Sequence, residues 1–421
     1  MDIIKLVIIF VVIIILINLK IPLPGAMAIG AVLGCILYQM GLLGSLQVIV
    51  EGILNETTIS VLVITYVITF LQRMLEKRGD LVKAQNALSG IFNSRRVNAS
   101  AAPIFIGLLP GAASAFIAGD MVKAACGDYL DKDEQAFVTS YYRHIPESCL
   151  PTYSSIVLAI SLSGVALGSF LLSMVLPVIL LIFLGYVFYL RKVPKDTGIP
   201  PAEHKGREWG KLFASLWPLA LAIALVIIVP YIPFSSIEVL PDGIVEFLGD
   251  FPVWLAVIIS IVLYFFISHF SWKEIAPFFR SSIQPRIILT ILAVMVFKQV
   301  LTESGVIAQL PDALAQLPIP TFLVFALIFL VGTIVSGSTA IISLCIAPAF
   351  TAIPDGGVAL LMLLMCFSYA AMQVSPTHLC LTLIAEYFGS NFGAIVKKTI
   401  PVIAVFLVCI IGYYLILAAI L

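Results

Sequence analysis

The sequence predicts an all-α, polytopic membrane protein built from two inverted repeats. Its 421 residues are 61% hydrophobic and only 11% charged, whereas a soluble domain carries about 25% charged residues. Long apolar runs recur along the chain, among them 3–19, 212–229 and 400–421. An apolar helix of about 20 residues spans the ~30 Å hydrocarbon core of a membrane. The third observation is a pattern of short and interrupted apolar segments that occurs once in each half.

The basic residues predict how the chain crosses the membrane. Lys and Arg gather in 73–96, 191–211 and 273–286, whereas the connections 41–58 and 231–251 carry acidic residues only. Positive charge is retained on the cytoplasmic side. We therefore expect a multi-pass protein of the cell inner (plasma) membrane with five crossings in each half and both termini outside. The expected crossings are 3–19, 25–42, 58–76, 136–170, 171–190, 212–230, 253–269, 286–303, 358–388 and 397–419.

Two further segments, 97–126 and 320–350, are expected to be re-entrant hairpins. Each has two apolar arms on either side of a glycine, and each arm is only ~20 Å long, too short to cross. The crossings 136–170 and 358–388 each contain a Pro-Thr pair. Because proline lacks a backbone N–H, both crossings are expected to be broken helices.

The two halves align without gaps over a long stretch, which predicts an internal repeat. A shift of 226 residues pairs Gly79 with Gly305, and a shift of 225 pairs Gly164 with Gly389. Five crossings are an odd number, so the second repeat runs with opposite polarity. The predicted organisation is 1–195 for the first repeat, 196–211 for a cytoplasmic linker and 212–421 for the second repeat.

The hairpin tips and helix breaks are the expected binding site. Backbone groups of interrupted helices are tolerated within a membrane only where they line a polar cavity, and transporters bind substrates at such places. The alternative is that small residues permit close helix packing and that the prolines make structural kinks. The candidate substrate- or ion-binding residues are Gly111, Ser114, Thr152, Ser336, Gly337, Ser338, Thr339, Ser375 and Thr377.

Ionisable residues near these places are candidates for proton coupling or for charge compensation, because charge within a membrane is costly and usually functional. His144 and Glu147 are three residues apart, so both can face one side of a helix and exchange a proton. The alternative is a structural ion pair between Arg143 and Glu147. The candidates are Asp120, Arg143, His144, Glu147 and His378. The acidic run 128–134 is expected to be a solvated loop, and the seven cysteines are expected to be packing residues.

The sequence resembles the ion transporter superfamily at the two hairpin tips and the two helix breaks, which are 110–114, 336–339, 150–152 and 375–377. That group includes divalent-anion:sodium symporters and gluconate-type permeases, and the sequence looks most similar to an uncharacterised bacterial and archaeal integral membrane family within it. The resemblance implies a homodimer with a scaffold (3–76 and 212–303) and an elevator-like transport domain (97–190 and 320–421). This sequence differs from the family pattern at the hairpin tips. Neither tip has the Asn of the Ser-Asn-Thr motif found in sodium-coupled dicarboxylate members.

The function expected from these features is secondary active transport of a small, carboxylate-like organic anion by alternating access. The coupling ion is H⁺ or Na⁺. Arg143 or the hairpin amides would neutralise the anion, and Glu147, His144 or His378 would carry the proton. The alternatives are an intramembrane enzyme and a passive anion channel. We expect no catalytic residues, no metal site and no cofactor. We also expect no nucleic-acid partner, since the net charge is zero.

Overall fold

The computed structural model describes residues 2–108, 113–197, 205–229, 232, 252–309, 312, 318–376 and 378–420. Within these ranges the chain forms helices and turns and no strand. Six of the described helices are long and apolar enough to cross a membrane, judged by length and composition, and shorter apolar helices accompany them. The expectation of an all-helical, polytopic membrane protein is confirmed at this level.

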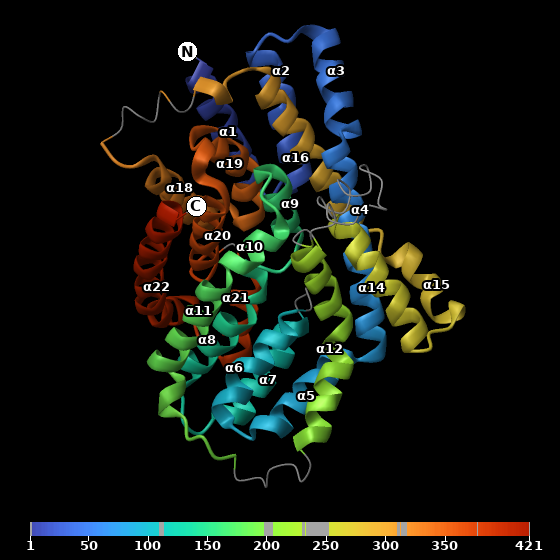
Figure 1. The fold of residues 1–421 in the computed structure, drawn as a ribbon. Coiled ribbons are helices and arrows are strands. Elements are labelled where there is room, and N and C mark those ends of the chain that lie inside the picture. Colours follow the sequence, from blue (N-terminus) through green and yellow to red (C-terminus); the bar gives the residue numbers. More distant parts are fainter. Residues whose placement is uncertain are drawn as a thin grey trace.

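The first half of the chain begins with helices that pack in the upper part of the view and ends with helices in the lower part (Figure 1). These are α1 (Asp2–Asn18), α2 (Leu23–Leu37), α3 (Gly41–Leu54), α4 (Glu56–Arg78), α5 (Asp80–Phe92), α6 (Arg95–Ile106), α7 (Ala113–Cys126), α8 (Lys132–Arg143), α9 (Ser154–Ser163), α10 (Leu167–Ser173) and α11 (Val175–Phe188).

The second half starts at the lower end of the same view with α12 and returns upward. Its helices are α12 (Lys205–Ile228), α14 (Val253–Ile267), α15 (Trp272–Ser281), α16 (Pro285–Glu303), α18 (Thr321–Ser336), α19 (Ser338–Ala352), α20 (Gly357–Met372), α21 (Leu379–Phe388) and α22 (Phe392–Ile420).

Three helices were not expected from the sequence: α3, α5 and α15. The segment of α3 was predicted to be an outward connection, but it packs against α16, and Gly52 makes the contact possible. A Cβ on Gly52 would lie 2.8 Å from the backbone Cα of Val296, so any larger residue would separate the two helices. Most of the remaining surface of α3 is exposed, with Leu42 and Leu43 at 78% and 83%. A helix with one narrow contact stripe has too weak a periodicity to be recognised in an apolar sequence.

The core of the molecule is α20, in which all residues from Ala359 to Met372 are buried. It packs against α18 and α22, and α10 also contacts it. On either side of this core the hairpin formed by α6 and α7 lies in the lower part of the view, and the hairpin formed by α18 and α19 lies in the upper part (Figure 1). The second arm of each hairpin contacts a broken helix of the other half: α7 packs against α21, and α19 packs against α9.

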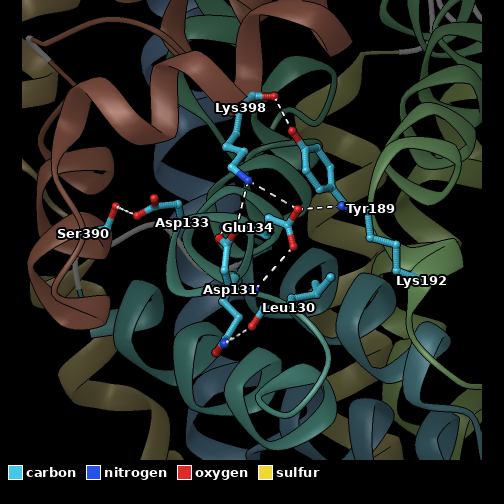
Figure 2. A network of polar contacts seen from close by, with 9 residues as sticks. Leu130, Asp131, Asp133, Glu134, Tyr189, Lys192, Ser390 and Lys398 are labelled. Carbon is cyan, nitrogen blue, oxygen red and sulfur yellow. Dashed lines mark hydrogen bonds and ion pairs between the residues drawn. The ribbon is translucent and has the colours of Figure 1, made fainter.

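A polar network fastens the start of α8 to distant segments (Figure 2). The carboxylate of Glu134 lies 2.6 Å from Nζ of Lys192 and 3.3 Å from Nζ of Lys398, which also lies 3.0 Å from the carboxylate of Asp131. Burial raises the pKa of Asp131, but the amide of Glu134 and the Lys398 ammonium outweigh it, so the pKa lies below its usual value. The expectation of a solvated acidic loop is therefore wrong for Glu134, whose side chain is only 9% exposed.

Replacing Glu134 with Gln removes the charge shared by Lys192 and Lys398. We expect the unfolding free energy in mixed micelles to fall by about 1–3 kcal/mol, as for a hydrogen bond to a charged group that is mostly buried. Glu76→Gln is the matched control, because Glu76 pairs with Arg73 at 3.0 Å with both side chains partly exposed. That change should cost less than about 0.5 kcal/mol. Equal losses for the two variants would contradict the importance of the network.

Candidate functional site

Two interrupted helices meet in the middle of the molecule, at the places where the sequence predicts breaks. The first helix ends with α8 at Arg143, passes through a short 3-10 turn (Pro146–Ser148) and continues as α9 from Ser154. The second ends with α20 at Met372 and continues as α21 from Leu379. The broken segments expose backbone groups that an intact helix would have paired.

The ends of the two breaks touch through a pair of histidines. Nε2 of His144, at the C-terminal end of α8, lies 2.8 Å from Nε2 of His378, which precedes α21. The two rings are nearly perpendicular, at 77°, with centroids 4.6 Å apart. His144 is fully buried, and His378 is partly exposed. The sequence singled out both residues, and the structure brings them together.

The contacts of His144 determine its tautomer. Its Nδ1 lies 2.6 Å from the backbone carbonyl oxygen of Ser140, which can only accept, so Nδ1 must carry the proton. Its Nε2 lies 2.9 Å from a guanidinium nitrogen of Arg143, which can only donate. Nε2 must therefore keep its lone pair. His144 is held neutral, and His378 donates its Nε2–H to the same lone pair.

Arg143 and Glu147 provide the charges of this cluster. The Arg143 side chain is 2% exposed, and its positive charge acts on the carboxyl group of Glu147 and on the thiol of Cys380. This arrangement is compatible with the alternative of a charge interaction between Arg143 and Glu147. The expected contact between His144 and Glu147 is present only between their backbone groups. The Glu147 N–H donates to the His144 carbonyl at 3.1 Å.

Neighbouring side chains fix the positions of the two breaks. The Tyr369 hydroxyl of α20 donates to the carbonyl of Tyr141 at 2.9 Å, which joins the two helices one turn before their ends. The Tyr153 hydroxyl donates to the Gly107 carbonyl at the end of α6. Gln72 of α4 donates to the Thr152 carbonyl at 3.2 Å. The breaks are thus held by α4, by the first hairpin and by each other.

Among the residues that the structure describes, three buried polar atoms near the breaks and the second hairpin find no hydrogen-bond partner: Oγ1 of Thr152, Oγ of Ser336 and Nε2 of Gln373. Gln373 is 2% exposed, and its Oε1 accepts from the Ser140 hydroxyl at 3.2 Å. A buried polar group without a partner costs about 1–3 kcal/mol. These atoms can be satisfied by a polar guest, and two of the three were candidates from the sequence.

The second hairpin turns at Gly337 between α18 and α19. Its backbone, with φ 86° and ψ 156°, is accessible only to glycine. Ser375 donates to the Ile334 carbonyl at 2.8 Å, which joins the second break to this hairpin. Ser338 and Thr339 form the first turn of α19. Gly111, Thr377 and the side chain of Ser114 lie outside the described residues.

Asp120 is not part of the histidine cluster. It lies on α7, where the Tyr387 hydroxyl of α21 donates a hydrogen bond to its carboxylate. Its contact thus joins the first hairpin to the second broken helix at some distance along α21 from His378.

Three residues of the site were missed by the sequence analysis: Ser140, Gln373 and Cys380. Sγ of Cys380 lies within 4.8 Å of one ring nitrogen of each histidine. The signal for Ser140 is its position one helical turn before His144, and Gln373 is the first polar residue after a long apolar helix. The sequence places Cys380 among the packing residues, because the cysteines lie mainly in apolar segments and form no Cys-x-x-Cys pair.

Replacing Gly337 with Ala tests whether the hairpin depends on this backbone conformation. A Cβ at φ 86° and ψ 156° is strained, so we expect a loss of about 1–3 kcal/mol of unfolding free energy. The matched control is Gly412→Ala in α22, where a Cβ meets no atom within 4 Å. Gly412→Ala should leave the stability unchanged or slightly higher. Unfolding of both variants in mixed micelles gives the comparison, and wild-type stability of Gly337→Ala would contradict it.

Comparison with known proteins identifies a family without an assigned activity. No curated protein matches the sequence. The profile of one family, described as "Protein of unknown function (DUF401)", matches residues 2–418, almost the entire chain. The chain therefore belongs to the DUF401 family.

Proposed function

We propose that this protein is a secondary active transporter of a small, carboxylate-like organic anion, coupled to H⁺ or Na⁺. The observation that carries the proposal is the meeting of two broken helices at a buried cluster that contains Arg143, His144, Glu147 and His378. Ionisable residues at such a depth are expensive and are found mainly at substrate and proton pathways. Interrupted helices in corresponding positions of two halves are the usual setting for a transporter site.

Matching helix ends support an inverted repeat of 1–195 and 212–421. α9 and α21 have ten residues each and both end at a left-handed glycine, with φ 72° at Gly164 and 61° at Gly389. α4 and α16 are likewise followed by glycines with positive φ, 66° at Gly79 and 67° at Gly305. These are the glycine pairs that the sequence shift aligns.

The packing of the outer helices supports the same proposal. α16 of the second half packs against α2 and α3 of the first, and α4 of the first half packs against α14 and α15 of the second. A two-fold relation between the halves produces this reciprocal exchange. We propose that these helices (3–76 and 212–303) form a scaffold and that the hairpins and broken helices (97–190 and 320–421) move against it as an elevator in a homodimer.

The orientation proposed for the protein places both termini outside the plasma membrane. The N-terminus lies at the upper end in Figure 1, and the basic segment after α11 lies at the lower end. A cytoplasmic lower end agrees with the distribution of positive charge.

The site offers separate groups for an anion and for a proton. Arg143 and the N-terminal ends of α9 and α21 present positive charge and free amides, which favour a carboxylate. Of the three proton carriers considered, His144 is fixed as a neutral acceptor by Ser140 and Arg143. Glu147 and His378 remain, and either can exchange a proton without breaking that arrangement.

Uptake by proteoliposomes tests the proposed function. Purified protein is reconstituted, and uptake of a panel of labelled mono-, di- and hydroxycarboxylates is measured under an inward H⁺ gradient, an inward Na⁺ gradient and no gradient. At least one carboxylate should accumulate under one of the gradients. Equal, gradient-independent fluxes would indicate a channel, and no flux for any anion would contradict anion transport.

Replacing Glu147 with Gln should abolish accumulation driven by a proton gradient, because the neutral amide cannot release a proton. Exchange of internal for external substrate should continue, since it needs no net proton movement. Glu76→Gln, on the exposed end of α4, is the matched control and should accumulate substrate at the wild-type rate. Proton-driven accumulation by Glu147→Gln at the wild-type rate would exclude Glu147 as the carrier.

A further inference from the structure

We propose that His144, His378 and Cys380 form a three-ligand site for one soft monovalent metal ion, Cu(I). One ring nitrogen of His144, one ring nitrogen of His378 and Sγ of Cys380 all lie within 4.8 Å of one another. Imidazole nitrogen and thiolate sulfur are ligands that Cu(I) prefers. The proposal stands on this geometry and does not rest on the proposed transport function.

The orientation of His144 is that of a metal ligand. Its Nδ1–H is held by the carbonyl of Ser140 at 2.6 Å, so the lone pair of Nε2 points into the cluster. Metal-ligating histidines almost always donate their second N–H to a carbonyl or carboxylate in this way. The ring is therefore already set in the tautomer that a metal requires.

The distances need only a small adjustment. The two Nε2 atoms are 2.8 Å apart, and two metal–nitrogen bonds of about 2.0 Å at a trigonal angle place the nitrogens roughly 3.5 Å apart. His378 precedes α21 and is partly exposed, so its ring is the one that can shift outward. On binding, its proton moves from Nε2 to Nδ1 by exchange with solvent, which gives Nε2 the lone pair that the metal needs. Cys380 follows two residues later in the first turn of the same helix.

Arg143 occupies the lone pair of His144 when no metal is bound, at 2.9 Å. An ion must displace this donor. The carboxyl group of Glu147, on which the charge of Arg143 already acts, provides the alternative partner. The positive charge of Arg143 therefore stays balanced by Glu147 while Nε2 of His144 becomes available to the metal.

Charge balance selects a monovalent ion. Cu(I) binds the Cys380 sulfur as the S–H bond breaks, and the proton leaves to solvent, so one positive charge replaces another. Arg143 and Glu147 continue to cancel, and the net charge of the buried cluster is unchanged. A Zn²⁺ ion would leave one excess positive charge in a medium where unpaired charge is costly, and it would require a fourth ligand.

The sulfur is reachable and can ionise. Cys380 is partly exposed, so an ion can approach from the same side as His378. A thiol that binds a metal ion loses its proton to solvent, and the positive guanidinium of Arg143 acts on this sulfur. The N-terminal end of α21 acts in the same direction as Arg143.

The test is Cu(I) binding by the purified full-length protein in detergent, without oxygen, in competition with the chromophoric chelator bicinchoninate. The wild type should retain one tightly bound ion. His378→Asn and Cys380→Ser should each weaken its binding at least tenfold, the lower end of the range seen for disturbed metal shells, about 10–100-fold. His269→Asn, at a residue in the turn after α14, and Cys409→Ser, at an exposed thiol of α22, are the matched controls and should bind as the wild type does.

X-ray absorption of the wild-type complex gives a second measurement that needs no variant. It should show one sulfur and two imidazole nitrogens around copper. The proposal is overturned if the spectrum shows only sulfur or only light atoms, if His378→Asn and Cys380→Ser bind Cu(I) as tightly as the controls, or if Zn²⁺ displaces Cu(I) from the site. Because these readouts measure binding alone, they are independent of whether the proteoliposomes transport an anion.

Discussion

The contact between His144 and His378 is the interaction on which the arrangement of the site depends. It joins the end of α8 to the start of α21, two segments 234 residues apart in the chain. Both segments interrupt a helix in the apolar centre of the protein, where backbone groups without partners are costly. The pair joins the two interruptions through their ring nitrogens, and Nδ1 of His144 donates to the backbone carbonyl of Ser140 near the end of α8. Tyr369 and Tyr153 then fix the two breaks against α8 and α6.

The fixed tautomer of His144 determines which histidine donates and which accepts in this contact. The Ser140 carbonyl holds the proton on Nδ1 of His144, and Arg143 and His378 both turn donors toward its Nε2. A second proton on His144 would bring three N–H groups together with no acceptor among them. The cluster therefore resists protonation at His144 for geometric reasons as well as electrostatic ones. Any change of charge has to occur at Glu147, at His378 or at Cys380.

Much of the helix order was predictable from the sequence because it depends on local rules. Proline and glycine marked both breaks and the turn at Gly337, and apolar length marked the long helices. The helices α3, α5 and α15 are missed by a search for long apolar segments. α3 buries few residues in an apolar sequence, whereas α15 is short and amphipathic and begins with a Ser271–Glu274 capping box, which apolar length does not reveal. Glu134 was taken for part of a solvated loop, since its partners Lys192 and Lys398 lie far away in the chain.

The site itself was predictable by residue but not by contact. Arg143, His144, Glu147 and His378 were singled out one by one, because charge and histidine are rare in such a sequence. That His144 meets His378 follows only from the tertiary packing of α8 against α21. Cys380 has no distinguishing sequence signal, since cysteine is common in apolar cores, and the position of Gln373 after a long apolar helix does not show which residues it contacts. Their roles emerge only when both breaks are seen together.

In the two proposals for this cluster, Arg143 is the residue that connects the organic anion with the metal ion. In the unliganded arrangement its guanidinium donates to Nε2 of His144 and so blocks the atom that a metal would need. A carboxylate that accepts from this guanidinium frees the histidine, and a metal on the histidine leaves the guanidinium to Glu147 or to the carboxylate. Each ligand therefore removes an obstacle to the other, and linkage requires the effect to be equal in both directions. Through Arg143, the affinity for the anion and the affinity for the soft metal ion are thermodynamically coupled in this proposal.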